Sequence, residues 1–339
     1  SQSQCVLRKH EILICGGWYK GACYSYHTLK NEYKFICEYP SHVQLKGNCV
    51  VKLEDNDKDK NQITLLSFGS DLSGESKHTL VMKYVSVWSN SKKLKKLNNY
   101  NKWIPFTDNH NDPIIIGRDR DRYQGARAVI GGINKNLLFI TYFSNNISVF
   151  DLNTFQFIKH DTLPTKSLIT YHCFVSSSGN GQEQKMMKTN KQNDQMLLFC
   201  RKTGLSIEYD EDNNTFQFRK LSIHDFIAPF YKYAYVCIND VILFFGGYDD
   251  LVYSKLVHKY SIRKNKWMKF KNTLPSPLRD CVAILSKEDN HIHILGGIDD
   301  KKTISKDEMK FITEYWIRTL KIKLGWINDF DEIILKYIR

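Results

Sequence analysis

Short apolar segments of strand length recur along the chain, and each ends in a turn-forming sequence or a remnant of one. Three of them end in Gly-Gly, one ends in Gly-Ser, and two have the same form without glycine. They occupy residues 12–17, 242–247 and 292–297, then 65–70, and finally 137–142 and 197–202. From Gly16 to Gly296 the mean spacing is about 56 residues, a period found in repeat proteins whose unit is one small sheet. The pattern predicts six copies of such a unit.

A pair of aromatic residues seven positions apart follows the apolar run in most units. Tyr209 and Phe216, for example, flank a polar, turn-forming stretch, and this spacing is typical of two short strands joined by a tight turn. The pairs are Tyr26 and Tyr33, Phe150 and Phe157, Tyr209 and Phe216, and Tyr260 and Trp267. In the second unit we expect Tyr84 and Trp103 to form the equivalent pair, separated by a lysine-rich insertion around Lys92–Lys96.

A small residue opens a short apolar strand just before each apolar run. These residues are Cys5, Cys49, Ala128, Cys173, Ala234 and Cys281. Cysteine and alanine share the position, so we expect a requirement for small size where the inner strands of neighbouring units converge. Packing therefore explains these thiols better than a metal site or a disulfide. The nine cysteines include no C-x-x-C pair, and in a reducing compartment they would remain thiols.

Each unit is thus expected to contain four strands, in an order that resembles the kelch repeat, whose period is about 50 residues. The resemblance covers residues 1–300, extends to the central domain of galactose oxidase, and implies an all-β, six-bladed kelch-type β-propeller. It also implies a rigid ring whose variable loops bind a partner protein. Some kelch-like propellers are enzymes, including copper radical oxidases and sugar-modifying enzymes, but their metal or acid-base residues cannot be matched onto this sequence.

The last unit departs from the pattern because no aromatic pair follows its Gly-Gly run. We therefore expect the last blade to be incomplete within the chain, with its edge exposed or covered, and residues 301–339 to form a tail of about two helices. Ser305 and Glu308 fit a capping box at the start of the first helix. Its apolar stripe is Ile312, Trp316, Leu320 and Leu324, and the second helix would carry Phe330, Ile333, Ile334 and Tyr337. The stripe either docks on the propeller or is offered to a partner.

Charge adds a preference for certain partners without changing the predicted fold. The formal net charge of +13 favours polyanions such as acidic protein surfaces, nucleic acid or anionic lipid. A compositional bias toward lysine and asparagine in loop-like segments is an alternative explanation of the same charge. The sequence shows neither a signal peptide nor an apolar run of membrane-spanning length, so we expect a soluble cytoplasmic protein.

The sequence contains no convincing constellation of catalytic residues. Asp119 and Asp121 alternate with arginines, which would hold both carboxylates ionised in a salt-linked loop. His291 and His293 have strand spacing and could begin a metal site, but no third ligand is evident. A phosphate-binding loop, a dinucleotide-binding fingerprint and a nucleophile elbow are all missing from the sequence. We therefore expect a non-enzymatic protein with no cofactor and no metal.

The loops at the Gly-Gly ends of the units carry arginines and aromatic residues, which are favoured as interface anchors. The expected partner-binding residues are Arg118, Arg120, Arg122, Arg127, Arg201, Lys202, Arg279, Trp18, Tyr19, Tyr123 and Tyr248. Because arginine captures carboxylate or phosphate groups in a bidentate manner, the leading hypothesis is a protein-interaction module, or scaffold, for an acidic or phosphorylated protein segment. The alternative is a basic protein that binds nucleic acid or an acidic filament surface through charge alone, although no recognised nucleic-acid motif is present.

Overall fold

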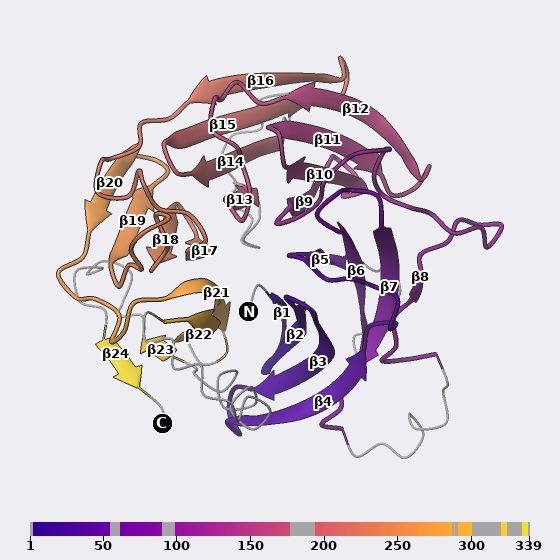
Figure 1. Cartoon of the computed structure of the whole chain (residues 1–339), viewed down its shortest axis with the longest axis horizontal. Helices are drawn as coiled ribbons and strands as arrows, with labels where there is room; N and C mark the ends of the chain where they lie inside the picture. The colour runs from indigo at the N-terminus through magenta and orange to yellow at the C-terminus, as the bar shows by residue number, and fades with distance from the viewer. Residues whose placement is uncertain are drawn as a thin grey trace. The chain divides into compact units, whose positions relative to one another are not determined.

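The fold consists of strands and turns. The computed structural model describes residues 3–54, 62–89, 99–176, 194–286, 288, 291–299, 320–323 and 334–337. Within these ranges there is no helix, and the strands form four-stranded antiparallel sheets in which each strand pairs with the next along the chain (Figure 1). The chain divides into two compact units. We call residues 3–163 with 168–170 the N-terminal unit, and residues 164–167 with the chain from 171 onward the C-terminal unit.

The N-terminal unit contains three of these sheets. The first consists of β1 (Gln4–Arg8), β2 (Glu11–Gly17), β3 (Lys20–His27) and β4 (Glu32–Glu38). The second consists of β5 (Cys49–Leu53), β6 (Gln62–Ser70), β7 (Lys77–Val85) and β8 (Ile104–Pro105). The third consists of β9 (Arg127–Gly131), β10 (Leu137–Tyr142), β11 (Asn146–Asp151) and β12 (Gln156–Thr162).

The C-terminal unit contains two further sheets of the same form before residue 300. The first consists of β13 (Cys173–Ser176), β14 (Asp194–Cys200), β15 (Thr203–Asp210) and β16 (Thr215–Lys220). The second consists of β17 (Ala234–Ile238), β18 (Val241–Phe245), β19 (Val257–Ser261) and β20 (Lys266–Lys269). The last sheet of this unit begins with β21 (Arg279–Ser286) and β22 (His291–Ile298), and takes its other two strands from beyond residue 300.

The core of each unit lies between the faces of neighbouring sheets. In the N-terminal unit, Leu65 of β6 packs in one apolar cluster with Leu13 of β2, and Leu66 packs in another with Leu138 of β10. Leu65 and Leu66 are both fully buried. Because successive side chains of a strand point to opposite faces, both faces of this sheet are covered by protein. This is the packing expected of propeller blades. It explains why the second strand of each four-stranded sheet has an uninterrupted apolar sequence.

The small residues at the start of each sequence repeat lie where the first strands of neighbouring sheets meet. β1 contacts β5, β5 contacts β9, and β17 contacts β21. Cys49 and Cys281 are almost fully buried there, and burial raises the pKa of their thiols to about 11 and about 12. All nine cysteines are free thiols. The structure thus places Cys49 and Cys281 in a packing role, as expected from the exchange of cysteine with alanine.

The aromatic pairs face each other across the third and fourth strands, as the spacing predicts. Tyr209 and Phe216 are register partners with ring centroids 4.9 Å apart, and Tyr260 and Trp267 are partners at 5.0 Å. Each first tyrosine also donates its hydroxyl to an asparagine five residues later, at 2.7 Å for Asn214. The same bond joins Tyr26 to Asn31 and Tyr260 to Asn265, and all three asparagines have positive φ. The tyrosine therefore fixes the left-handed turn residue of its own hairpin, which the sequence analysis missed.

The second sheet departs from this arrangement. Trp103 precedes the two-residue strand β8 and stacks on Tyr39, with centroids 4.7 Å apart and planes at 24°. Its indole nitrogen donates to the Cys23 sulfur at 3.4 Å. The Tyr84 hydroxyl donates instead to the Glu11 carboxylate at 2.5 Å. Trp103 thus anchors the first and second sheets to each other, whereas the sequence analysis assigned it to a hairpin pair with Tyr84.

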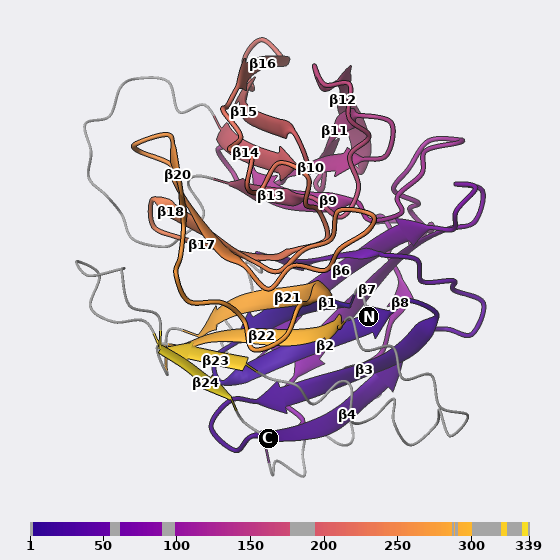
Figure 2. The same cartoon turned by 60° about the vertical axis from the view of Figure 1, so that its left-hand side comes forward.

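The predicted incomplete blade and helical tail are wrong where the structure describes the tail. β23 (Leu320–Lys323) pairs with β22, and β24 (Ile334–Tyr337) pairs with β23, so the last sheet also has four strands (Figure 2). The residues 320–323 read Leu-Lys-Ile-Lys, an alternation of period two that suits a strand. Pairing also satisfies the backbone groups at the edge of β22, which would otherwise be open. Ile312, Trp316 and Leu324 of the predicted stripe lie outside the described residues, whereas Leu320 begins β23.

Candidate partner-binding site

The Gly-Gly pairs form turns that only glycine accommodates easily. Gly246 and Gly247 have φ values of +67° and +118°, a region that side chains with a Cβ rarely adopt. A Cβ on Gly246 would also collide with the carbonyl oxygen of Leu278. These requirements explain the Gly-Gly marker of this unit by backbone geometry alone. The turn positions the loops that follow, which carry the candidate binding residues.

In the N-terminal unit the predicted residues form two separate groups. Trp18 and Tyr19 lie in the turn after β2 with 37% and 59% of their surface exposed, and the Lys46 ammonium lies 5.3 Å from the Tyr19 ring centroid. Arg118 is held by its own loop, because its Nε and Nη2 atoms each donate to the Asp121 carboxylate at 3.2 Å. A third donation reaches the Tyr142 hydroxyl, also at 3.2 Å.

The neighbours of Arg118 differ in how much they offer to a partner. Arg120 and Arg122 are exposed, and the Arg122 guanidinium lies 5.6 Å from the Phe143 ring centroid. Arg127 is half-buried and donates to the Ala126 carbonyl. Tyr123 is fully buried against Phe68 and Tyr142, so it supports the loop from inside the core and has no surface for a partner.

In the C-terminal unit the structure brings three of the predicted residues into one cluster. Arg201 lies in the turn between β14 and β15, and its guanidinium stands 4.1 Å from the centroid of the Tyr231 ring. Its Nη2 atom forms an ion pair with Asp250 at 2.7 Å, and the Tyr231 hydroxyl donates to the same carboxylate at 2.8 Å. The hydrogen bond from Tyr231 has the larger effect, and together with the bond from Arg201 it holds the pKa of Asp250 below its ordinary value. Asp250 is therefore a fixed anion that orients both cation and ring.

A second arginine next to this group also contacts tyrosine rings and pairs with an aspartate. The Arg279 guanidinium lies 4.7 Å from the Tyr248 ring centroid and 5.0 Å from that of Tyr253, and it pairs with Asp280 at 3.4 Å. Backbone bridges join Tyr231 to Tyr248 and Tyr248 to Tyr253, so the three rings are carried by one small, hydrogen-bonded loop assembly. Arg279 keeps 17% of its side chain exposed. Most of its side chain is therefore buried against the two rings and leaves little surface for a partner.

Lys232 is the cation of the cluster that no carboxylate pairs with at ion-pair distance among the described residues. Its ammonium lies 5.0 Å from the Tyr171 ring centroid and 5.4 Å from that of Tyr231. Burial lowers the pKa of this lysine, and Asp280 opposes that effect. We define the arginine–tyrosine cluster as Tyr171, Arg201, Tyr231, Lys232, Tyr248, Asp250, Tyr253, Arg279 and Asp280.

An apolar loop tip projects beside this cluster. Leu251 and Val252 are 88% and 57% exposed. The tip is held in shape because the Asp249 carboxylate accepts the backbone N–H groups of both residues, at 3.1 Å and 2.6 Å. The Tyr248 hydroxyl closes the loop by donating to the Asp250 carbonyl at 2.8 Å. Apolar side chains held rigidly in water next to tyrosine and arginine side chains favour a partner, because covering them removes apolar surface from water at little ordering cost.

The sequence analysis found Arg201, Arg279 and Tyr248 but missed most of their neighbours. Tyr231 and Lys232 lie just before β17, away from any Gly-Gly pair, and Leu251 and Val252 have no repeat marker. Lys202 is exposed next to Arg201 and lies beside the cluster. A signal for the missed residues exists in the Tyr-Asp-Asp-Leu-Val-Tyr stretch at 248–253, where apolar residues interrupt a polar loop.

Neither metal ligation nor a membrane span is indicated within the described ranges. No group of three or more His, Cys, Asp or Glu side chains there has the geometry to hold a metal ion. The His291 and His293 rings have centroids 6.4 Å apart with their planes tilted at 55°, and among the described residues no third ligand accompanies them. Over the same residues, no helix has the length and apolar character that crossing a membrane requires.

Comparison with known proteins agrees with this architecture. Residues 229–272 match the family model of the Kelch motif, a range that covers β17 to β20 and carries much of the arginine–tyrosine cluster. No curated protein sequence matches the chain. Among solved structures the chain is similar to the structure of YjhT, with a TM-score of 0.58 and 11% identity over 99% of this chain and 97% of that one. At this identity the likeness shows a shared fold. The motif and the fold together confirm the resemblance that the repeated markers predict: the chain carries a Kelch motif and has the blade arrangement of a β-propeller.

Proposed function

We propose that this chain is a protein-interaction module without a catalytic role, and that it binds a segment of a partner protein at the arginine–tyrosine cluster. Kelch propellers commonly mediate protein interactions, and the Kelch motif at residues 229–272 includes the loop that carries the cluster. In this proposal the sheet of β21 to β24 is the sixth and last blade. Loops on a rigid sheet scaffold suit recognition because the scaffold is already ordered before the partner binds and loses no conformational entropy on binding.

The exposed tip Leu251–Val252 is the observation that carries the proposal. Leu251 has 88% of its surface exposed, so covering it with a partner removes apolar surface from water and lowers the free energy of the complex. Asp249 and Tyr248 fix the loop before binding, so little conformational entropy is lost when the tip docks. The half-buried Tyr248 ring extends this surface, while its hydroxyl remains paired with the Asp250 carbonyl.

The charges around the tip favour an acidic or phosphorylated segment, although less strongly than the residue types suggest. The cations Arg201, Lys202, Lys232 and Arg279 are offset by three carboxylates on the same loops, those of Asp249, Asp250 and Asp280, so the formal charge of the site is +1, and Asp250 and Asp280 form ion pairs with Arg201 and Arg279. Arg201 keeps 36% of its side chain exposed and has further N–H donors beyond the one that binds Asp250. A phosphoryl group carries more charge than a carboxylate and can share this guanidinium with Asp250.

The test is capture of partners on immobilised protein with quantitative mass spectrometry. Leu251→Asp removes the apolar anchor, and Arg201→Glu reverses the charge that faces the partner. Two control variants carry the same changes elsewhere: Ile133→Asp on another exposed apolar residue, and Arg263→Glu on another exposed arginine that pairs with an aspartate. We expect one set of partners to be lost with both site variants and retained with both controls.

Treatment of the input with phosphatase separates the two kinds of acidic partner. Loss of binding after treatment identifies a phosphorylated segment, and unchanged binding identifies a carboxylate-rich one. Partners that remain with Leu251→Asp and Arg201→Glu would refute the assignment of recognition to this cluster.

A further inference from the structure

A second candidate surface lies in the N-terminal unit, at the end of its first sheet that is opposite the Gly-Gly turn. β2 begins at Glu11 and ends at Gly17, and Glu11 is the register partner of His27, so His27 marks the far end of the sheet. Trp88 follows β7 and reaches this end, where its ring meets the His27 ring edge-on with centroids 5.1 Å apart. The surface is therefore built from the first two sheets of one unit.

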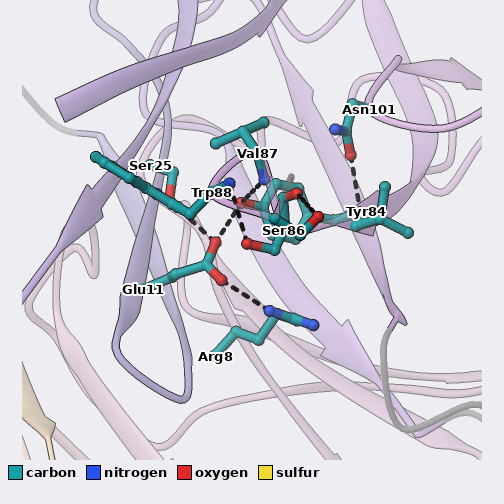
Figure 3. Close-up of polar contacts among 10 residues, drawn as sticks. Arg8, Glu11, Ser25, Tyr84, Ser86, Val87, Trp88 and Asn101 are labelled. Atoms are coloured by element: carbon teal, nitrogen blue, oxygen red, sulfur yellow. Dashed lines mark hydrogen bonds and ion pairs between the residues drawn. The ribbon is translucent and has the colours of Figure 1, made fainter. Parts of the chain in front are cut away.

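The indole of Trp88 is fixed by a buried polar network (Figure 3). Its ring nitrogen donates to the Ser25 hydroxyl at 2.9 Å, and that hydroxyl donates to the Glu11 carboxylate at 3.3 Å. The same carboxylate forms an ion pair with Arg8 at 2.8 Å, with both side chains less than 10% exposed. The backbone N–H of Trp88 also donates to the Ser86 hydroxyl. The ring is thus held in one orientation although it remains partly open to solvent.

Two exposed lysines crowd the face of this ring. The ammonium of Lys34 lies 4.3 Å from the ring centroid and that of Lys30 lies 5.2 Å from it. Lys9 is exposed in the turn between β1 and β2, at the same end of the sheet. Within the described residues none of these lysines takes part in an ion pair, in contrast to Arg118, Arg201 and Arg279. Their charge is therefore available to a ligand.

We propose that this surface, defined as Lys9, His27, Lys30, Lys34 and Trp88, binds single-stranded nucleic acid. A fixed indole is a stacking platform for a base, and the lysines would hold the flanking phosphates. Lysine suits this task because a mobile ammonium can leave the ring and follow a phosphate without a fixed bidentate geometry. An acidic peptide would use the same charges, but its carboxylate side chains have no ring to stack on the indole, whereas every nucleotide has a base. The inference is independent of the partner site in the C-terminal unit.

The test is a fluorescence anisotropy titration with a labelled oligothymidylate of about 20 nucleotides, in salt from about 50 to about 200 mM. The variant Lys30→Glu/Lys34→Glu should raise Kd at least about 10-fold. The matched control Lys166→Glu/Lys255→Glu makes the same change in net charge at two exposed lysines outside the surface and should leave Kd within about twofold. An equal effect of both pairs would overturn the proposal in favour of nonspecific charge.

The contribution of the ring is tested separately. Trp88→Ala should raise Kd about 5- to 100-fold, because stacking of one base on an aromatic ring is lost. Ultraviolet crosslinking of the bound oligothymidylate to the unaltered protein, followed by peptide mapping, provides a measurement that does not depend on the variant folding. A crosslink at Trp88 supports the platform. A crosslink elsewhere, or displacement of the oligonucleotide by polyglutamate at equal charge concentration, would overturn it.

Discussion

The buried pair of Arg8 and Glu11 gives the sharpest stability prediction. The Glu11 carboxylate accepts from Arg8 at 2.8 Å, from Tyr84 at 2.5 Å and from Ser25 at 3.3 Å, and only 6% of Glu11 is exposed. Glu11→Ala leaves the guanidinium, itself 9% exposed, without its counter-charge in a region where water cannot solvate it. Breaking a buried pair from one side costs about 3–5 kcal/mol. That is a large share of the ~5–15 kcal/mol by which domains are stable.

The double variant Arg8→Met/Glu11→Leu separates the loss of a pair from the loss of a packed side chain. It removes both charges, so the remaining cost comes from the hydroxyl groups of Tyr84 and Ser25, at about 1–3 kcal/mol. We therefore expect the double variant to be more stable than Glu11→Ala. The measurement is the free energy of unfolding in urea, followed by tryptophan fluorescence, for Glu11→Ala, for the single variants Arg8→Met and Glu11→Leu, for the double variant and for the unaltered chain. A cost below about 1 kcal/mol for Glu11→Ala, or additive costs in the double variant, would refute the reasoning.

Two further predictions concern buried histidines and a turn glycine. Burial lowers the pKa of both His78 and His258 to about 4, so below the unfolded-state value near 6.5 the unfolded chain binds protons that the folded chain does not. Stability should therefore fall as the pH drops from about 6.5 to about 4, by ~3 kcal/mol per histidine, and pH-dependent thermal melts of His258→Phe should show a smaller fall. No change in the slope with pH would contradict this assignment. Gly246→Ala should cost at least about 1–3 kcal/mol in urea denaturation, because φ is +67° and the new Cβ meets the Leu278 carbonyl, while a cost within error would show that the turn relaxes.

The strands could be predicted from the sequence because their determinants are local. Tyr260 and Trp267 are seven residues apart and become register partners, since a tight turn fixes which residues can face each other. The prediction for the tail was wrong because two local patterns overlap there. Residues 312–324 fit a helical period, but residues 320–323 also fit a strand period. The open edge of β22 favours the strand. A local pattern does not contain the edge that decides between the two periods.

The candidate site was predictable only in part because its contacts join loops far apart in the chain. Arg201 meets Asp250 across about fifty residues, so its charge is partly neutralised by a carboxylate that no short-range pattern connects to it. Counting arginines therefore overstated the positive charge of the Gly-Gly loops. Trp88 was not predicted as a binding residue at all. Its fixed orientation depends on Ser25 and Glu11, which belong to an earlier sheet, so no pattern near Trp88 in the sequence indicates it.

The strand order of the last sheet has a consequence for folding order. The sheet of β17 to β20 gives the direct comparison, because β18 ends at Phe245 and its partner β19 begins at Val257. β22 ends at Ile298 and its partner β23 begins at Leu320, so this pair closes over about twice as many residues, at an extra entropic cost of about 0.6 kcal/mol. We expect the last sheet to be completed after that of β17 to β20, and hydrogen exchange during refolding to protect Ile292 and Ile294 later than the equivalent residues of β18. Until then the edge of β22 stays open, and an open strand edge is exposed to aggregation.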